Sequence, residues 1–129
     1  MSALERLNAD VMAAMDNYDL QKAVRPFVRF LDDLTKWYIR RSRRRFWKSQ
    51  DDGDKQQAYA TLHQVLLRLC QIAAPFTPFI AESIYANLRR PGMPESVHLC
   101  DFPQASASGR DLDLEAQMDE VIQVVELGR

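Results

Sequence analysis

The apolar residues of this chain recur at helical intervals from its first turn onward. The first stripe advances in steps of three and four and comprises Leu4, Leu7, Val11 and Met15. This spacing predicts a helix over residues 2–15. The turn formers in "DNYDL" interrupt the pattern, and a second helix is expected from Leu20. Its stripe is expected to face the core and comprises Leu20, Val24, Phe27, Leu31, Leu34 and Tyr38.

Two more helices are predicted after the polar stretch "KSQDDGDK", whose glycine favours a turn. The first has Asp52 or Asp54 as its candidate N-cap and ends before Pro75. Its stripe comprises Ala58, Leu62, Val65, Leu69 and Ile72. The pair Thr77 and Pro78 is typical of the start of the next helix. The apolar face of that helix is expected to consist of Ile80, Ile84 and Leu88.

The helical period is lost between residues 91 and 109, where the alternation of Val97 and Leu99 indicates a short strand-like segment. A last amphipathic helix follows, and its apolar residues are Leu114, Met118, Val121, Ile122 and Val125. Together these elements predict an all-α fold, an antiparallel helical bundle of about four helices plus an appended C-terminal helix.

Composition fits one compact domain, since 47% of the 129 residues are hydrophobic and can build a core. The apolar runs fall far short of the roughly 20 residues that span a bilayer. The start "MSALERLNAD" lacks the apolar segment of a signal peptide. We therefore expect a cytoplasmic monomer that does not enter a membrane. Cys70 and Cys100 are expected to be two reduced thiols.

The net charge of −1 conceals a strong division along the chain. Seven of the 17 basic residues lie in a window without any acid, and they are Lys36, Arg40, Arg41, Arg43, Arg44, Arg45 and Lys48. Outside this window, the chain has ten basic and 18 acidic residues. An acidic body with one dense cationic segment can orient an anionic partner through its electric field.

Residues that could carry catalysis do not gather in the sequence. His63 and His98 are isolated, and no glycine-rich phosphate loop is present. Asp32 and Asp33 are adjacent, so on a helix they diverge by about 100° and cannot both face one substrate. Asp32 lies one turn before Lys36, which predicts an ordinary ion pair. We expect no catalytic, cofactor or metal site in this chain.

The basic segment has two unusual features if it is helical. Lys36, Arg40, Arg44 and Lys48 would form one ridge, where like charges cost a few tenths of a kcal/mol per pair unless an external anion compensates. Continuing the core stripe past Tyr38 leads to Ser42 and Arg45. The helix is therefore expected to extend beyond its bundle or to meet a partner that is not hydrophobic.

RNA phosphates suit this segment, because guanidinium groups bind phosphate bidentately and clustered cations release counterions. Trp37, Phe46 and Trp47 are then either stacking surfaces or core residues. A solvated charged face is the alternative interpretation of the arginines, and five arginines within six positions without an intervening acid disfavour it. An anionic membrane surface fits less well, because bundle packing consumes the neighbouring apolar stripe.

Three blocks of sequence are similar to one known family. "NYDLQKAVRPFVRFLDDLTKWYIRRSRRRFWKS", "APFTPFIAESIYANL" and "ESVHLCDFP" follow one another as in the helical anticodon-binding domain of isoleucyl-tRNA synthetases. The resemblance covers residues 2–103. It implies a helical anticodon-binding bundle at 1–103 and, at 104–129, a linker and the start of the following C-terminal region.

The resemblance implies a parent enzyme that joins isoleucine to its tRNA with ATP and magnesium. The signatures "HIGH" and "KMSKS" are missing, so the chain resembles an excised domain that is inactive alone and holds no cofactor. Its implied partners are the tRNA for isoleucine and the catalytic domain of the parent enzyme. The implied RNA-binding residues are Lys36, Trp37, Arg40, Arg41, Arg43, Arg44, Arg45, Trp47 and Lys48. The alternative is a helical protein-interaction module whose arginine cluster docks on an acidic protein surface.

Overall fold

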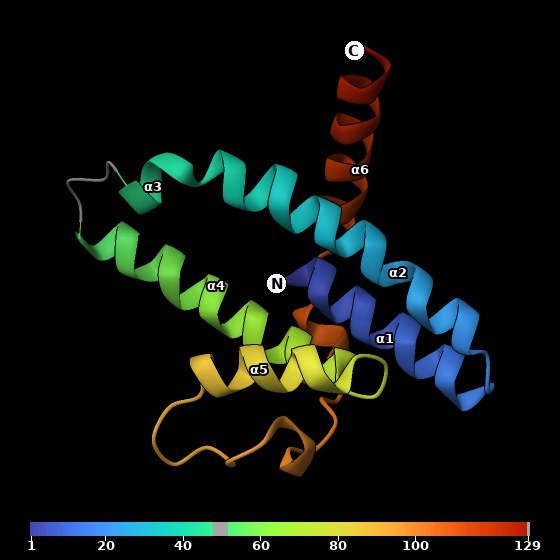
Figure 1. Ribbon diagram of the computed structural model, residues 1–129. Coiled ribbons are helices and arrows are strands. Elements are labelled where there is room, and N and C mark those ends of the chain that lie inside the picture. The colour runs from blue at the N-terminus through green and yellow to red at the C-terminus, as the bar shows by residue number, and fades with distance from the viewer. Residues whose placement is uncertain (48–51, 129) are drawn as a thin grey trace.

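The computed structural model describes residues 1–47 and 52–128, and within these ranges every regular element is helical. The elements are α1 (Ser2–Asp16), α2 (Leu20–Asp32), the π-helical η1 (Asp33–Ile39), α3 (Arg43–Trp47), α4 (Asp52–Ala73), α5 (Pro78–Leu88), the 3₁₀ turns η2 (Val97–Leu99) and η3 (Ala107–Gly109), and α6 (Leu112–Leu127). Figure 1 shows α2, η1 and α3 as one long rod. This rod, α1, α4 and α5 form an antiparallel bundle to which α6 is appended, which confirms the predicted all-α fold.

The α1–α2 hairpin follows the sequence prediction at its turn. Tyr18 is exposed and adopts a positive φ of 55°, which reverses the chain. The Asp19 carboxylate then accepts a hydrogen bond of 2.9 Å from the backbone amide of Lys22. This N-cap fixes the start of α2 at Leu20, as predicted.

The main core lies between α1, the rod and α4. Its buried residues are Leu4, Leu7, Val11, Phe30, Leu34, Val65 and Ile72. The stripe predicted for α1 is confirmed, since Met15 also packs against this cluster. The stripe predicted for α4 is confirmed too, with Leu62 and Leu69 partly buried beside Val65 and Ile72.

The stripe predicted for α2 and its continuation is half right, because Phe27, Leu34 and Tyr38 pack in the main core but the other three members do not. Leu20, Val24 and Leu31 are 61%, 45% and 45% exposed, whereas Ala23 and Phe30 are buried. Apolar residues occupy two neighbouring faces of α2, so periodicity alone does not show which face packs. An alanine lets two backbones approach closely, and the face with Ala23 is the one that turns to the core.

The rod does not leave the bundle after Tyr38, so the first of the two alternatives that the sequence left open is wrong. Its buried row continues in steps of four from Leu34 through half-buried Tyr38 to Ser42 and Phe46, which are 8% and 4% exposed. In a regular α-helix such a row would rotate by about 40° per step. The wider π-helical turn of η1, in which the Arg40 amide donates to the Thr35 carbonyl, absorbs this drift. Phe46, and not Arg45, therefore faces the core.

A second, smaller core lies under α5. It consists of Cys70, Ala74, Ala81, Tyr85 and Val97. The predicted face of α5 is wrong, because Ile80 and Ile84 are exposed. Tyr85 is buried instead, and its hydroxyl donates a hydrogen bond of 3.0 Å to the carbonyl of Pro94. The neighbouring Ala81 is small enough for close packing on α4.

The strand-like segment predicted around Val97 is also wrong. Residues 97–99 form the 3₁₀ turn η2, because the Glu82 carboxylate accepts hydrogen bonds from the Ser96 hydroxyl (2.8 Å) and the Val97 amide (2.9 Å). Cys70 and Cys100 are free thiols, as predicted. The Cys100 thiol donates to the Tyr85 hydroxyl at 3.3 Å.

The linker that follows η2 returns across α1. The side-chain amide of Asn8 donates to the Pro103 carbonyl at 2.8 Å. Glu5, which is buried, accepts a hydrogen bond from the Ser106 amide at 2.9 Å and pairs with Arg68 of α4. These contacts place the start of α6 beside the N-terminus of α1.

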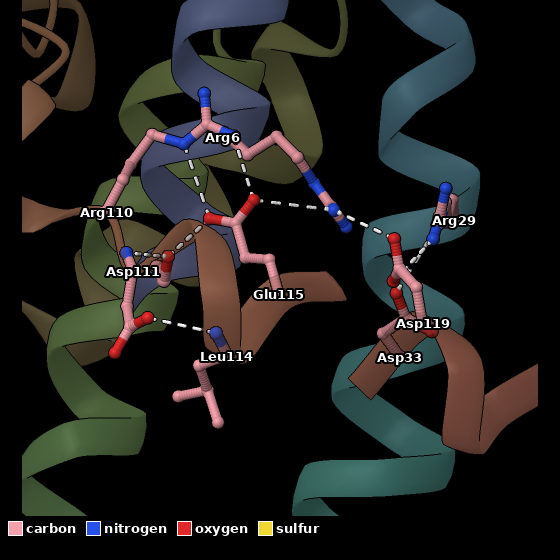
Figure 2. A network of polar contacts seen from close by, with 9 residues as sticks. Arg6, Arg29, Asp33, Arg110, Asp111, Leu114, Glu115 and Asp119 are labelled. Carbon is pink, nitrogen blue, oxygen red and sulfur yellow. Dashed lines mark hydrogen bonds and ion pairs between the residues drawn. The ribbon is translucent and has the colours of Figure 1, made fainter. Parts of the chain in front are cut away.

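Charged contacts attach α6 to the bundle. Figure 2 shows Glu115 between Arg110 and Arg6, and Asp119 between Arg6 and Arg29. The shortest of these ion pairs are Arg29–Asp119 at 2.7 Å and Arg110–Glu115 at 2.8 Å. No side chain of α6 is fully buried within its described residues, and the helix projects from the bundle in Figure 1. Arg6 of α1 and Arg29 of α2 therefore link α6 to the bundle by charge, whereas Arg110 lies in the linker just before α6.

Acid is expected to weaken this attachment. The hydrogen bond from Arg110, opposed by burial, holds the pKa of Glu115 below its ordinary value of 4.5. Glu115 therefore stabilises the fold fully above pH 4.5, and this contribution is lost as the pH falls through the lowered pKa. Burial raises the pKa of Asp33, so protonation of Asp33 partly offsets the loss.

We expect Glu115→Gln to lower the free energy of unfolding by about 1–2 kcal/mol at pH 7, because it removes charge-assisted hydrogen bonds. The difference from the unmodified chain should shrink below pH 4.5. Urea unfolding at neutral and acidic pH measures both. The exposed Glu120 of the same helix offers Glu120→Gln as the matched control. If Glu115→Gln lowers the free energy of unfolding equally at both pH values, the proposed link between the pKa of Glu115 and stability is wrong.

Among the described residues, no helix combines the length and the apolar character needed to cross a membrane.

Candidate nucleic-acid interface

Aromatic packing holds the basic end of the rod on α4. Phe46 is nearly buried, and its ring centroid lies 5.1 Å from that of Tyr59, 6.1 Å from that of Trp47 and 6.5 Å from that of Tyr38. A five-residue helix has little stability of its own. The order of α3 therefore depends on this aromatic cluster. Of its members Phe46 is a core residue, so the stacking role considered for it is excluded by burial.

Arg45 has an acidic partner on the facing helix. Its guanidinium donates to both carboxylate oxygens of Asp54, at distances of 2.6–3.0 Å. This bidentate contact raises the pKa of Arg45 and lowers that of Asp54. It ties α3 to the first turn of α4 and neutralises one charge of the basic segment. No motif in the sequence indicates this pair, since the two residues come together only when α3 and α4 pack.

Lys36 is also paired. Its ammonium lies 2.7 Å from the Asp32 carboxylate one turn earlier, as the sequence predicted. Lys48 lies outside the described residues. Of the proposed ridge, Arg40 and Arg44 remain exposed, and neither contacts an acidic group within residues 1–47 and 52–128.

Two arginine–tryptophan pairs share one geometry but differ in exposure. The Arg41 guanidinium lies over the Trp37 ring at 5.6 Å, and that of Arg43 lies over the Trp47 ring at 5.5 Å. Both pairs are four residues apart, so the helix sets their contact. Trp37 is half-buried, whereas Trp47 is 67% exposed.

Trp37 lines an apolar groove of about 430 Å³ between η1, α1, α4 and α6. Other side chains in its wall are Leu4, Leu34, Tyr38, Val65, Met118 and Ile122. Four of its charged members, Arg6, Asp33, Glu115 and Asp119, lie in the network of Figure 2, and Arg41 also lines the groove. In the described part of the chain, no group of three His, Cys, Asp or Glu residues could hold a metal ion.

The segment thus presents four exposed guanidinium groups without an acidic partner among the described residues, on Arg40, Arg41, Arg43 and Arg44. Each is held on a helix that packs against the bundle. Such an array can bind several phosphates, which is the chemistry of a nucleic-acid backbone contact. Tyr59, which the sequence did not suggest, is the exposed aromatic residue that α4 adds beside Phe46.

Comparison with known proteins adds an independent observation. Residues 1–129 match the family model described as "Anticodon-binding domain of tRNA ligase". The chain is 52% identical over 128 residues to the isoleucine-tRNA ligase of Protochlamydia amoebophila, and 50% identical over 129 residues to that of Treponema denticola. These alignments cover 99% and 100% of this chain but only 12% of each relative. The chain thus spans about one eighth of the length of the relatives it matches.

Proposed function

Because the chain belongs to the anticodon-binding domain family of tRNA ligases, we propose that it binds tRNA for isoleucine through the basic end of its helical rod. The observation that carries the proposal is the set of guanidinium groups on Arg40, Arg41, Arg43 and Arg44, which have no acidic partner in the described ranges. Phosphate contacts made by these side chains would position the tRNA, and unstacked bases would be needed for selection.

The ionic contacts divide the candidate RNA-binding residues that the structure describes into those that are free to bind phosphate and those that already have an acidic partner. Arg40 and Arg44 are the first choice for phosphate, since no acid competes for them in the described ranges. Lys36 and Arg45 would first have to leave Asp32 and Asp54. Their role in the proposal is to hold the segment in place.

The proposal extends to the enzyme of which such a domain is a part. In that enzyme, isoleucine is joined to tRNA with ATP and magnesium, and the domain lies against the catalytic domain. The chain works as a cytoplasmic protein and without a cofactor of its own. Residues 1–103 form the binding bundle, and residues 104–129 lead into the next region. The sequence identity between this chain and isoleucine-tRNA ligases supports this assignment.

Removing Arg40 and Arg44 together tests the proposal. We expect the Arg40→Ala/Arg44→Ala variant to bind tRNA for isoleucine at least about ten-fold more weakly at low salt, because two charge-assisted hydrogen bonds to phosphate are removed. The slope of log affinity against log salt should flatten by roughly one for each phosphate that is no longer neutralised. Fluorescence anisotropy of labelled tRNA across a salt series measures both quantities.

The matched control removes the same charge elsewhere. Arg89 and Arg90, exposed at the end of α5, offer Arg89→Ala/Arg90→Ala. An equal decrease in affinity in both variants would mean that net charge alone governs binding. Undetectable binding of tRNA to the unmodified chain at low salt would instead support the interaction module, which family membership does not favour.

A further inference from the structure

The two arginine–tryptophan pairs of the basic segment can be compared directly, because they share one contact geometry but differ in how much of the tryptophan is buried. Both have a guanidinium 5.5–5.6 Å from the ring centroid. Trp37 finds neighbours in the groove under α6, and its burial explains its presence. Trp47 has the guanidinium of Arg43 and the edge-to-face ring of Phe46, yet 67% of it remains exposed. Packing therefore accounts for Trp37 but not for Trp47.

We propose that Trp47 and Arg43 form a platform that stacks one unpaired nucleobase while the neighbouring arginines hold its phosphates. An indole offers a flat apolar surface on which any base can stack, and arginine beside it adds attraction for a nucleotide. A base inside a duplex already has both faces covered by its neighbours. The ligand class is therefore a single-stranded nucleotide of a loop or bulge.

Contacts within the protein orient the platform before the ligand arrives. The Phe46 ring contacts Trp47 from within the core, and the Arg45–Asp54 pair links the same short helix to α4. A ring that already has such contacts loses less conformational freedom on binding than a free one, which favours affinity. Exposed Arg40 and Arg44 supply the charges that attract the backbone of the same strand.

The platform rests on the proposed function, because it presumes that RNA reaches the segment, but it can fail separately. Phosphate contact needs only charge, whereas stacking needs a base. An oligouridylate and an abasic ribose-phosphate oligomer of equal length and charge separate the two. Two single-tryptophan proteins provide the reporters: Trp37→Phe leaves Trp47, and Trp47→Phe leaves Trp37.

We expect oligouridylate to quench the fluorescence of Trp47 but not that of Trp37, and the abasic oligomer to quench neither. In addition, Trp47→Leu should bind oligouridylate about five-fold or more weakly while its salt slope and its affinity for the abasic oligomer stay unchanged. Because Trp47 is exposed, this variant should fold, and the Trp37→Phe reporter gives an answer even if it does not.

Three results would overturn the platform. If oligouridylate and the abasic oligomer bind and quench alike, the segment holds phosphates only, and the proposed function survives without stacking. If polyglutamate quenches Trp47 as oligouridylate does, the surface recognises acidic protein. If neither RNA-like ligand nor tRNA binds at low salt, the proposed function falls together with the platform.

Discussion

Replacing Arg68 by methionine is expected to lower the free energy of unfolding by about 3 kcal/mol at pH 7, because removing one partner of a buried ion pair leaves the other charged and desolvated. Arg68 is the side chain that compensates Glu5, which is only 4% exposed. The Nη2 atom of Arg68 also donates a hydrogen bond of 3.3 Å to the Gln104 carbonyl of the linker. Breaking such a pair typically costs about 3–5 kcal/mol. The lower value applies because the Arg68 side chain is itself 23% exposed.

In Arg68→Met, the contribution of Glu5 to the free energy of unfolding should change with pH in the direction opposite to that in the unmodified protein. Burial raises the pKa of Glu5, but hydrogen bonds from Ser106 and Arg68 outweigh it and hold the pKa below 4.5. In the unmodified chain Glu5 thus contributes stability above pH 4.5 that is lost at lower pH. Without Arg68, burial is expected to raise the pKa of Glu5 above the unfolded value. The variant should then lose stability as the pH rises through the unfolded value toward that raised pKa.

A double variant is the control for Arg68→Met. In Glu5→Leu/Arg68→Met no charge stays buried, so the decrease in stability should be clearly smaller than in the single variant. One penalty remains, because the Ser106 amide no longer has its acceptor. Urea unfolding at acidic and neutral pH compares the three proteins. Equal decreases in the single and the double variant would show that packing of the arginine stem, and not charge, matters at this site.

The apolar pattern predicted the buried row best in α1 and α4. In both helices the predicted stripe lies in the main core, and α4 also packs Leu67 and Cys70 in the second core. In α2 and α5 apolar residues occupy adjacent faces, and the buried face contains Ala23 or Ala81. Close approach of two backbones decided the orientation there. That choice depends on the partner helix, which the pattern of one segment does not contain.

The candidate site was predicted as a segment but not in its internal order. The family implied by the three sequence blocks is confirmed, and the arginines occupy one helical segment. The sequence did not show that Asp54 would neutralise Arg45, since this requires α3 and α4 to lie side by side. It also did not separate Trp37 from Trp47. Their difference arises from the groove formed with α6, which comes from a distant part of the chain.

Replacing Phe46 by alanine is expected to disorder α3 and to cost about 3 kcal/mol, since a nearly buried aromatic ring is removed. The ring is the shared contact of Tyr38, Tyr59 and Trp47. Without it, α3 keeps the Arg45–Asp54 contact as its main link to α4, and an ion pair exposed to solvent stabilises a helix only slightly. Urea unfolding measures the decrease, and amide hydrogen exchange over residues 43–47 reports the local disorder.

The same variant shows whether RNA binding needs only the positive charge of the arginines or also their ordered positions. Phe46→Ala leaves all arginines in the chain, so the long-range attraction for RNA is unchanged. If binding needs the guanidinium groups and the Trp47 ring in fixed positions, affinity for tRNA should fall together with the protection of α3 from exchange. Phe46→Leu is the matched control, because it keeps most of the buried volume and should retain both. Full tRNA affinity in Phe46→Ala with α3 disordered would mean that a flexible cationic segment is sufficient, and that the aromatic cluster serves folding alone.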